Sequence, residues 1–165
     1  MNYGKIIYCD IANGIGCRTS LFVSGCRRRC PGCFNKAAWD FGYGELFTAD
    51  TEDAVLRSLK PCYINGLTIL GGEPLAKENR IVVQALVSRV KREMPSKTIW
   101  VYTGYEYERL PIDAAPILRY IDVLVDGPFI EAQKDISLKF RGSANQRIIS
   151  IPKTARSGTV VEAVI

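Results

Sequence analysis

The sequence contains no histidine at all. This absence excludes zinc sites built from cysteine and histidine, Ser-His-Asp triads, Cys-His nucleophile pairs and acid–base catalysis by imidazole. If the chain is an enzyme, its difficult chemistry therefore has to come largely from a cofactor.

Long hydrophobic runs are also lacking. No apolar stretch approaches the roughly 18 residues that a membrane-spanning helix needs, and residues 1–10 include Lys5 and Asp10, unlike a signal peptide. We therefore expect a cytoplasmic protein with no membrane partner. The net charge of +5 is modest and 17 acidic residues dilute it, so we do not expect nucleic acid to be the main partner.

The residues that are present suit one folded domain. A chain of 165 residues with 47% hydrophobic residues can bury a real core. We expect strands at 21–23, 67–70, 98–102, 121–125 and 147–151, with helices at about 50–60, 77–94 and 113–120. This alternation predicts an α/β fold with a mostly parallel sheet. Because a complete eight-unit barrel takes at least about 200 residues, we expect a partial, open barrel of about five units.

Polar and glycine residues follow several of the expected strands. In open parallel sheets, ligands collect at the carboxyl ends of the strands. The cysteine-containing loop opens from the same edge, so the sequence predicts a site there. These strand ends carry Ser24-Gly25, Gly71-Gly72-Glu73, Thr103-Gly104 and Asp126-Gly127.

Three of the six cysteines, Cys26, Cys30 and Cys33, lie within eight residues. A chain without an export signal is not expected to hold a disulfide framework, so this spacing indicates a metal centre. A closed structural zinc site needs four ligands, and no fourth cysteine lies nearby. Three thiolates suit a four-iron cluster with one iron left open. The separate Cys9 and Cys17, like Cys62, are expected to be small, partly buried residues.

Three consecutive arginines, 27–29, stand between the first two cysteines of this loop. They could form a solvated surface, stabilise a reduced cluster, or dock an acidic electron donor or another protein. The sequence leaves these alternatives open.

The cysteine spacing, followed by Gly-Gly-Glu-Pro at 71–74, resembles the radical S-adenosylmethionine (SAM) enzymes, whose fold would make the open barrel one of the radical SAM type. Further blocks are similar to the family of activating proteins of anaerobic ribonucleoside-triphosphate reductase. The resemblance covers residues 2–149 of a single activase domain spanning 1–165, and 152–165 extend past it as a variable tail. The similar blocks are 22–26, 30–36 with Trp39, 67–75, 101–105, 123–127 and 141–146.

The resemblance implies an oxidoreductase that holds a [4Fe-4S] cluster through its catalytic cysteines, Cys26, Cys30 and Cys33. The cluster would cleave SAM reductively, and the 5′-deoxyadenosyl radical would generate a glycyl radical on the anaerobic reductase. An open barrel would leave room for the partner's glycine loop. A low-potential electron donor such as flavodoxin would supply the electron.

The resemblance also implies which residues contact SAM. Gly71 and Gly72, at the end of the strand expected at 67–70, would let the backbone approach the methionine amino group. The residues on either side of Cys33 would lie near the adenine. Phe34 stands where the family pattern leads us to expect tyrosine. Tyr102 could instead be a core aromatic residue, and Asp126 could merely begin a turn. The implied contacts are Gly32, Cys33, Phe34, Gly71, Gly72, Glu73, Tyr102, Thr103 and Asp126.

Two alternative functions stay open at this point. One is another small radical SAM enzyme with a different target. The other is a non-enzymatic cysteine metal module that binds nucleic acid or protein.

Overall fold

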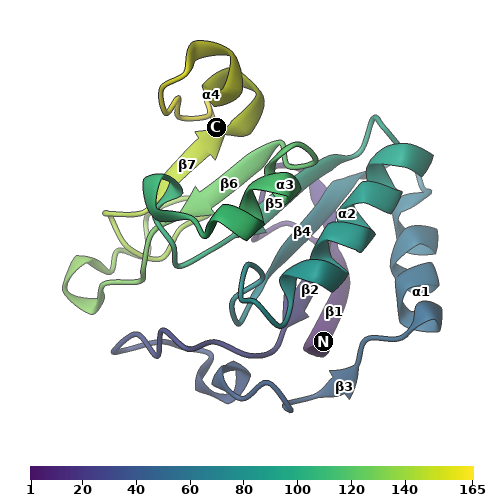
Figure 1. The fold of residues 1–165 in the computed structure, drawn as a ribbon, viewed down its shortest axis with the longest axis horizontal. Helices are drawn as coiled ribbons and strands as arrows, with labels where there is room; N and C mark the ends of the chain where they lie inside the picture. Colours follow the sequence, from purple (N-terminus) through teal and green to yellow (C-terminus); the bar gives the residue numbers. More distant parts are fainter.

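One open seven-stranded sheet runs through the protein, whose computed structural model describes residues 1–165 (Figure 1). The strands are β1 (Asn2–Asp10), β2 (Cys17–Val23), β3 (Glu45–Leu46), β4 (Ile64–Gly71), β5 (Thr98–Tyr102), β6 (Val123–Asp126) and β7 (Arg147–Ser150). Their order across the sheet is β3-β1-β2-β4-β5-β6-β7. The two outermost strands are not paired with each other, so the sheet is open.

Four α-helices and four short 3-10 helices connect the strands. The α-helices are α1 (Ala49–Leu59), α2 (Arg80–Glu93), α3 (Ala115–Leu118) and α4 (Ile151–Ser157). The 3-10 helices are η1 (Lys36–Trp39), η2 (Tyr107–Arg109), η3 (Ile112–Ala114) and η4 (Glu131–Gln133). None of the helices is long and apolar enough to cross a membrane.

Parallel pairing is confined to the centre of the sheet. β2, β4, β5 and β6 are parallel, whereas β1, β3 and β7 pair antiparallel at the edges. The predicted α/β class and open sheet are confirmed. The prediction of about five repeating units is wrong, because only three helical crossovers connect parallel strands. β1 joins β2 by a short turn, and the long segment between β6 and β7 contains no α-helix, so both edges become antiparallel.

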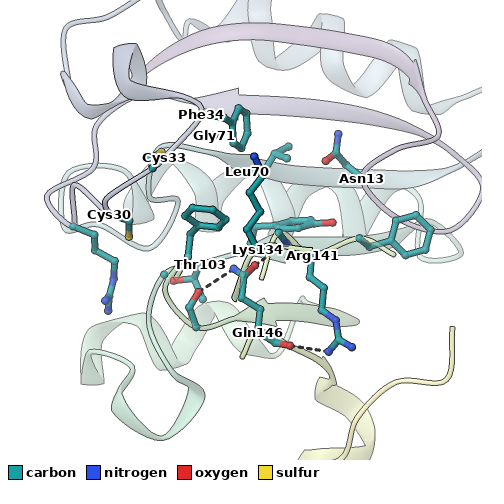
Figure 2. Close-up of a pocket in the computed structure, with 18 of the residues that line it drawn as sticks. Asn13, Cys30, Cys33, Phe34, Leu70, Gly71, Thr103, Lys134, Arg141 and Gln146 are labelled. Carbon is teal, nitrogen blue, oxygen red and sulfur yellow. Dashed lines mark hydrogen bonds between the residues drawn. The ribbon is translucent and has the colours of Figure 1, made fainter. Parts of the chain in front are cut away.

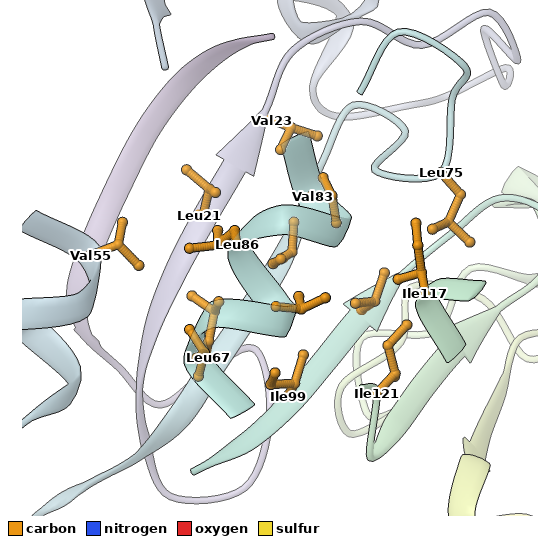
Figure 3. Packing of buried hydrophobic residues seen from close by; sticks show 14 of the residues in the cluster. Leu21, Val23, Val55, Leu67, Leu75, Val83, Leu86, Ile99, Ile117 and Ile121 are labelled. Carbon is orange, nitrogen blue, oxygen red and sulfur yellow. The ribbon is translucent and has the colours of Figure 1, made fainter. Parts of the chain in front are cut away.

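The main core lies between one face of the sheet and helices α1, α2 and α3 (Figure 3). Successive strand residues point to opposite faces, so Leu21, Leu67 and Ile99 pack toward the helices. Trp100, which follows Ile99 in the sequence, belongs to a smaller cluster on the other face. Each fully buried Leu or Ile side chain stabilises the fold by roughly 1.5–3 kcal/mol. Because the helices cover only one face of the sheet, the second face is available to form a functional site.

The bounds of two predicted helices differ from the structure. The helix predicted at 77–94 begins only at Arg80, because the side chain of Asn79 donates to the carbonyls of Ser24 and Glu73 (2.9 and 3.0 Å) and fixes the preceding turn. The helix predicted at 113–120 shrinks to α3, with Pro116 in its first turn.

The C-terminal segment packs beside β7 at the edge of the sheet (Figure 1). After α4 the chain turns at Gly158 and returns, so that the N–H of Ser150 donates to the carbonyl of Val161 (2.8 Å). The N–H of Ala163 donates to the carbonyl of Ile148 (2.7 Å).

Two cysteines outside the triplet form a disulfide. The antiparallel pairing of β1 and β2 places Cys9 and Cys17 with their Cα atoms 5.4 Å apart, and the structure joins them. The expectation of small, partly buried cysteines that take no part in a disulfide framework is therefore wrong for this pair. A sequence separation of eight residues does not reveal that the strand register sets them side by side. The other four cysteines are free.

Candidate functional site

A cavity of about 430 Å³ opens at the carboxyl ends of β4 and β5, a volume typical of small-molecule sites (Figure 2). Its walls come from the cysteine loop, these strand ends and the segment between β6 and β7. Every residue that the sequence predicted for the site, except Asp126, lines this cavity. They are Cys26, Cys30, Gly32, Cys33, Phe34, Gly71, Gly72, Glu73, Tyr102 and Thr103.

The cysteine loop supplies three free, partly buried thiols to one wall of the cavity. The main-chain N–H groups of Gly25 and Cys26 donate to the carbonyls of Ala38 and Trp39 (2.8 and 3.1 Å), which anchors the loop where it leaves β2. Gly25 has φ +93°, and the ring of Phe41 occupies the position that a Cβ would take. Burial raises the pKa of the Cys26 thiol.

The number and type of donors in this loop fit an iron–sulfur cluster better than a single ion. No group of three or more His, Cys, Asp or Glu side chains is gathered closely enough to hold one metal ion. In a cubane cluster each cysteine binds a different iron, so its sulfurs stand farther apart than the ligands of one ion. Three free thiols around one cavity match that requirement.

Gly71 and Gly72 allow the end of β4 to press against the cysteine loop. Gly71 has φ +108°, and a Cβ on Gly72 would lie 2.6 Å from the carbonyl oxygen of Gly25. The N–H groups of Gly72 and Glu73 donate to the carbonyls of Val23 and Gly25 (2.7 and 2.8 Å). The carbonyl of Gly72 accepts no backbone hydrogen bond, which leaves it free to accept one from a ligand.

The carboxylate of Glu73 joins the ends of β4 and β5. It is 2% exposed and accepts from the Thr103 hydroxyl (2.7 Å) and from the N–H groups of Leu75 and Gly104 (3.0 and 2.8 Å). Burial raises the pKa of Glu73, an effect that these three donors and Arg28 oppose. Thr103 uses its hydroxyl in this brace, so both side chains shape the wall of the cavity.

Two buried polar atoms that belong to cavity-lining residues have no partner. The hydroxyl of Tyr102 and the Nε of Arg141 are both unpaired. Burial raises the pKa of Tyr102. Since buried polar groups are nearly always hydrogen-bonded, these atoms indicate a ligand or ordered water in the cavity.

Asp126 lies outside the cavity lining. It is buried, and it accepts from the N–H of Tyr107 (2.8 Å) and from Arg147, which sits at the start of β7 (2.5 Å). Arg147 also binds Glu108 (2.8 Å) and lowers the pKa of that carboxyl to about 2. The structure therefore engages Asp126 in bracing β6 and β7.

The turn between β1 and β2 contributes Asn13 to the cavity rim. The side chain of Asn13 donates to Asp10 (2.6 Å), and its carbonyl accepts from Thr68 (2.9 Å). Buried Arg18 donates to Thr68 (2.7 Å) and lies where a Cβ on Gly14 would collide with it. These bonds hold the glycine-containing turn against the sheet.

The segment between β6 and β7 forms a wall that the sequence reasoning missed. Lys134 reaches across the cavity from this segment in Figure 2, and Arg141 lies nearby. Gln146 orders the segment, accepting from the N–H of Gly142 (2.8 Å) and donating to the carbonyl of Gly127 (3.0 Å). The polar block at 141–146 was the signal that could have located it. The other lining residues from this segment are Phe129, Asp135, Ile136, Leu138 and Phe140.

Comparisons with known proteins agree with this chemistry. The family model described as "4Fe-4S single cluster domain" matches residues 12–149. The chain is 44% identical over 152 residues to the anaerobic ribonucleoside-triphosphate reductase-activating protein of Enterobacteria phage T4, covering 91% of this chain and 94% of that protein. Proteins of the same name from Haemophilus influenzae and Escherichia coli K12 are 47% and 43% identical. These alignments cover 90% and 88% of this chain, and 97% and 96% of those proteins.

Proposed function

Because this chain belongs to the family of anaerobic ribonucleoside-triphosphate reductase-activating proteins, with a 4Fe-4S single cluster domain, we propose that it activates such a reductase by radical SAM chemistry. The name of the relatives indicates the reductase as the target, and the matching family model supports a [4Fe-4S] cluster. The open sheet, with its site at the carboxyl edge, is compatible with a partial barrel of the radical SAM type. The whole chain would act as a single activase domain.

The three cysteines and the open cavity support separate roles for the residues that would hold the cluster and those that would bind SAM. With a [4Fe-4S] cluster and SAM bound, the cluster would supply one electron to the sulfonium, releasing methionine and a 5′-deoxyadenosyl radical that removes a hydrogen atom from a glycine of the reductase. Cys26, Cys30 and Cys33 would hold the cluster, and one metal position would have no protein ligand. No acid or base is required, which suits a chain without histidine.

The other residues of the site would bind and orient SAM. The free carbonyl of Gly72 suits an ammonium group, and the unpaired hydroxyl of Tyr102 suits an acceptor. Lys134 and Arg141 bring positive charge that would balance a carboxylate. The apolar side chains around the cavity, among them Leu70 and those of the β6–β7 segment, would keep water away from a reactive radical.

The rim of the cavity favours a protein as the target. Phe34 and Ile136 both line the cavity, yet they are 89% and 95% exposed. Large apolar side chains exposed around one opening are typical of surfaces that a protein partner covers. We infer that the glycine-bearing segment of the reductase enters between them.

One observation carries the proposal above all others. Three free thiols and the Gly71-Gly72 turn, which come from different parts of the chain, line one cavity of ligand size.

Reductive SAM cleavage tests the proposal. The protein is reconstituted with iron and sulfide without oxygen, reduced with dithionite and mixed with SAM, and methionine and 5′-deoxyadenosine are quantified. Cys30→Ala should lower cleavage more than about a hundredfold and reduce bound iron. Cys62→Ala removes a free thiol outside the cavity and should behave like the parent. Full cleavage by Cys30→Ala would refute the ligand assignment.

A further inference from the structure

A second hollow, of about 240 Å³, shares Arg28 and Glu73 with the wall of the cavity. Four of its seven lining residues are cations, namely Arg27, Arg28, Lys77 and Arg80. We name this hollow the basic notch. Its single acidic residue, Glu73, is buried and already bound to three donors. The notch therefore presents positive charge to the solvent.

Part of this charge forms no ion pair within the protein. Arg27 pairs with Glu78 (2.5 Å), and Arg80 pairs with Asp113. Arg28 and Lys77 form no ion pair. Unpaired cations side by side in a concave surface attract an anionic group and raise its association rate.

Aromatic rings hold two of the three arginines of the notch, Arg27 and Arg28, in place. The guanidinium of Arg27 lies 4.7 Å from the centre of the Phe41 ring, and that of Arg28 lies 4.4 Å from the centre of the Tyr105 ring. Stacking on a ring fixes the plane of each guanidinium. Arg27 already binds Glu78, whereas Arg28 forms no ion pair and its N–H edge is arranged in advance for an acidic side chain.

The position of the notch indicates what kind of partner would use it. Arg27 and Arg28 stand between Cys26 and Cys30, so a protein bound at the notch touches the cysteine loop itself. The apolar rim of the cavity is formed by other residues, including Phe34 and Ile136. Two partners could therefore bind without sharing contacts.

The proposed chemistry consumes an electron that has to come from outside this chain. Only the cysteine triplet suits a cluster, since Cys9 and Cys17 form a disulfide and Cys62 is a lone exposed thiol. An electron donor must therefore approach the cysteine loop, and the notch is a charged surface on that loop.

We propose that the basic notch docks an acidic, low-potential electron-transfer protein, an inference that rests on the proposed function. One electron passes from the donor to the cluster, so that the donor is oxidised and the cluster reduced by one electron, with no atom transferred. Exposed charge pairs contribute mainly to association rate and specificity, as expected for a transient complex.

Binding of oxidised flavodoxin, a small acidic flavoprotein, tests the notch without any turnover. Lys77→Glu alters an exposed side chain without an ion pair, and a second variant combines Arg27→Gln with Lys77→Gln. Both should weaken flavodoxin binding about five- to tenfold at low ionic strength and flatten its salt dependence. The matched control, Lys153→Gln with Arg156→Gln, removes the same charge from exposed positions on α4 and should bind like the parent.

SAM cleavage driven by dithionite separates this proposal from the proposed function. Dithionite needs no docking surface, so the notch variants should cleave SAM as the parent does while flavodoxin-driven cleavage falls. Unchanged flavodoxin binding in both variants would overturn the notch proposal, as would weakened binding of the reductase with flavodoxin binding intact. A parent protein that cannot cleave SAM with dithionite would refute the proposed function instead, and the binding result would still decide the notch.

Discussion

Glu73 shows how a single buried side chain can set the geometry of the site. Its carboxylate joins Leu75, Thr103 and Gly104, and so fixes the ends of two parallel strands relative to each other. The resemblance in sequence implied that Glu73 contacts SAM. The structure adds that the side chain braces the wall on which Gly72 presents its free carbonyl.

Glu73→Gln should destabilise the fold by about 1–3 kcal/mol, because an amide nitrogen cannot accept from the N–H groups that the carboxylate now satisfies. Chemical denaturation measures this loss. Glu78→Gln, which removes an exposed carboxylate, is the control and should change stability by less than about 1 kcal/mol. Equal stability of the two variants would contradict the bracing role.

The pH dependence of stability offers a second measurement on the same residue. Burial raises the pKa of Glu73, so the folded state holds this proton to higher pH than the unfolded chain does. Where the folded state binds more protons, stability falls as pH rises. The parent should therefore lose stability as pH rises above 4.5, the ordinary pKa of a glutamate, and this decrease should be absent from Glu73→Gln. An identical pH profile in both proteins would contradict the raised pKa.

Gly72→Ala should disturb the cysteine loop directly. The added Cβ would lie 2.6 Å from the carbonyl oxygen of Gly25 and 3.0 Å from that of Ala38, so the backbone has to move. We expect a loss of about 1–3 kcal/mol and less iron bound after anaerobic reconstitution. Gly42→Ala is the matched control, since its Cβ would meet nothing closer than 3.5 Å. Iron binding by Gly72→Ala at the level of the control would show that the close approach is unimportant.

Among the helices and strands, those with a strongly periodic spacing of apolar residues could be predicted from the sequence. Val83, Val87 and Val90 are spaced in the sequence as residues on one face of a helix are, and all three are buried in α2. The beginning of that helix could not be read from periodicity, because Asn79 bonds to carbonyls on the cysteine loop and on the end of β4. Local pattern identifies an element, whereas contacts distant in sequence decide where it begins.

The segment between β6 and β7 is the element that local pattern described least well. It contributes many of the cavity-lining residues, but their grouping depends on long-range packing such as the edge-to-face contact of Phe140 with Trp100 (5.5 Å). Asp126 illustrates the same difficulty. Its position at a strand end suggested a ligand contact, yet its partner Arg147 lies 21 residues further along the chain.

SAM binding should protect this segment from trypsin. Lys134 and Lys139 are exposed in the structure, and Lys134 lines the cavity. A ligand that fills the cavity stabilises the folded arrangement of this segment and slows cleavage at both sites. Cleavage at Lys153 and Arg156 in α4, away from the cavity, serves as the internal control, and mass spectrometry identifies the cut sites. Equal slowing at all four sites, or at none, would show that the segment is not part of the binding site.

In the molecule as a whole, the open sheet separates the hydrophobic core from the candidate site. One face carries the helices and the main core, and the carboxyl edge carries the cavity, with the basic notch on the far side of Arg28 and Glu73. The cysteine loop lies between the two hollows. This arrangement would let an electron enter from one partner and a radical leave toward another.

Isotope transfer tests whether the chain takes a hydrogen atom from a glycine in its reductase, as we propose. Reductase is produced with glycine deuterated at its α-carbon, mixed without oxygen with the reconstituted, reduced protein and SAM, and the 5′-deoxyadenosine is analysed by mass spectrometry. We expect one deuterium in the product, with a glycyl radical seen by electron paramagnetic resonance. Unlabelled 5′-deoxyadenosine, formed while the glycyl radical appears, would contradict the proposal.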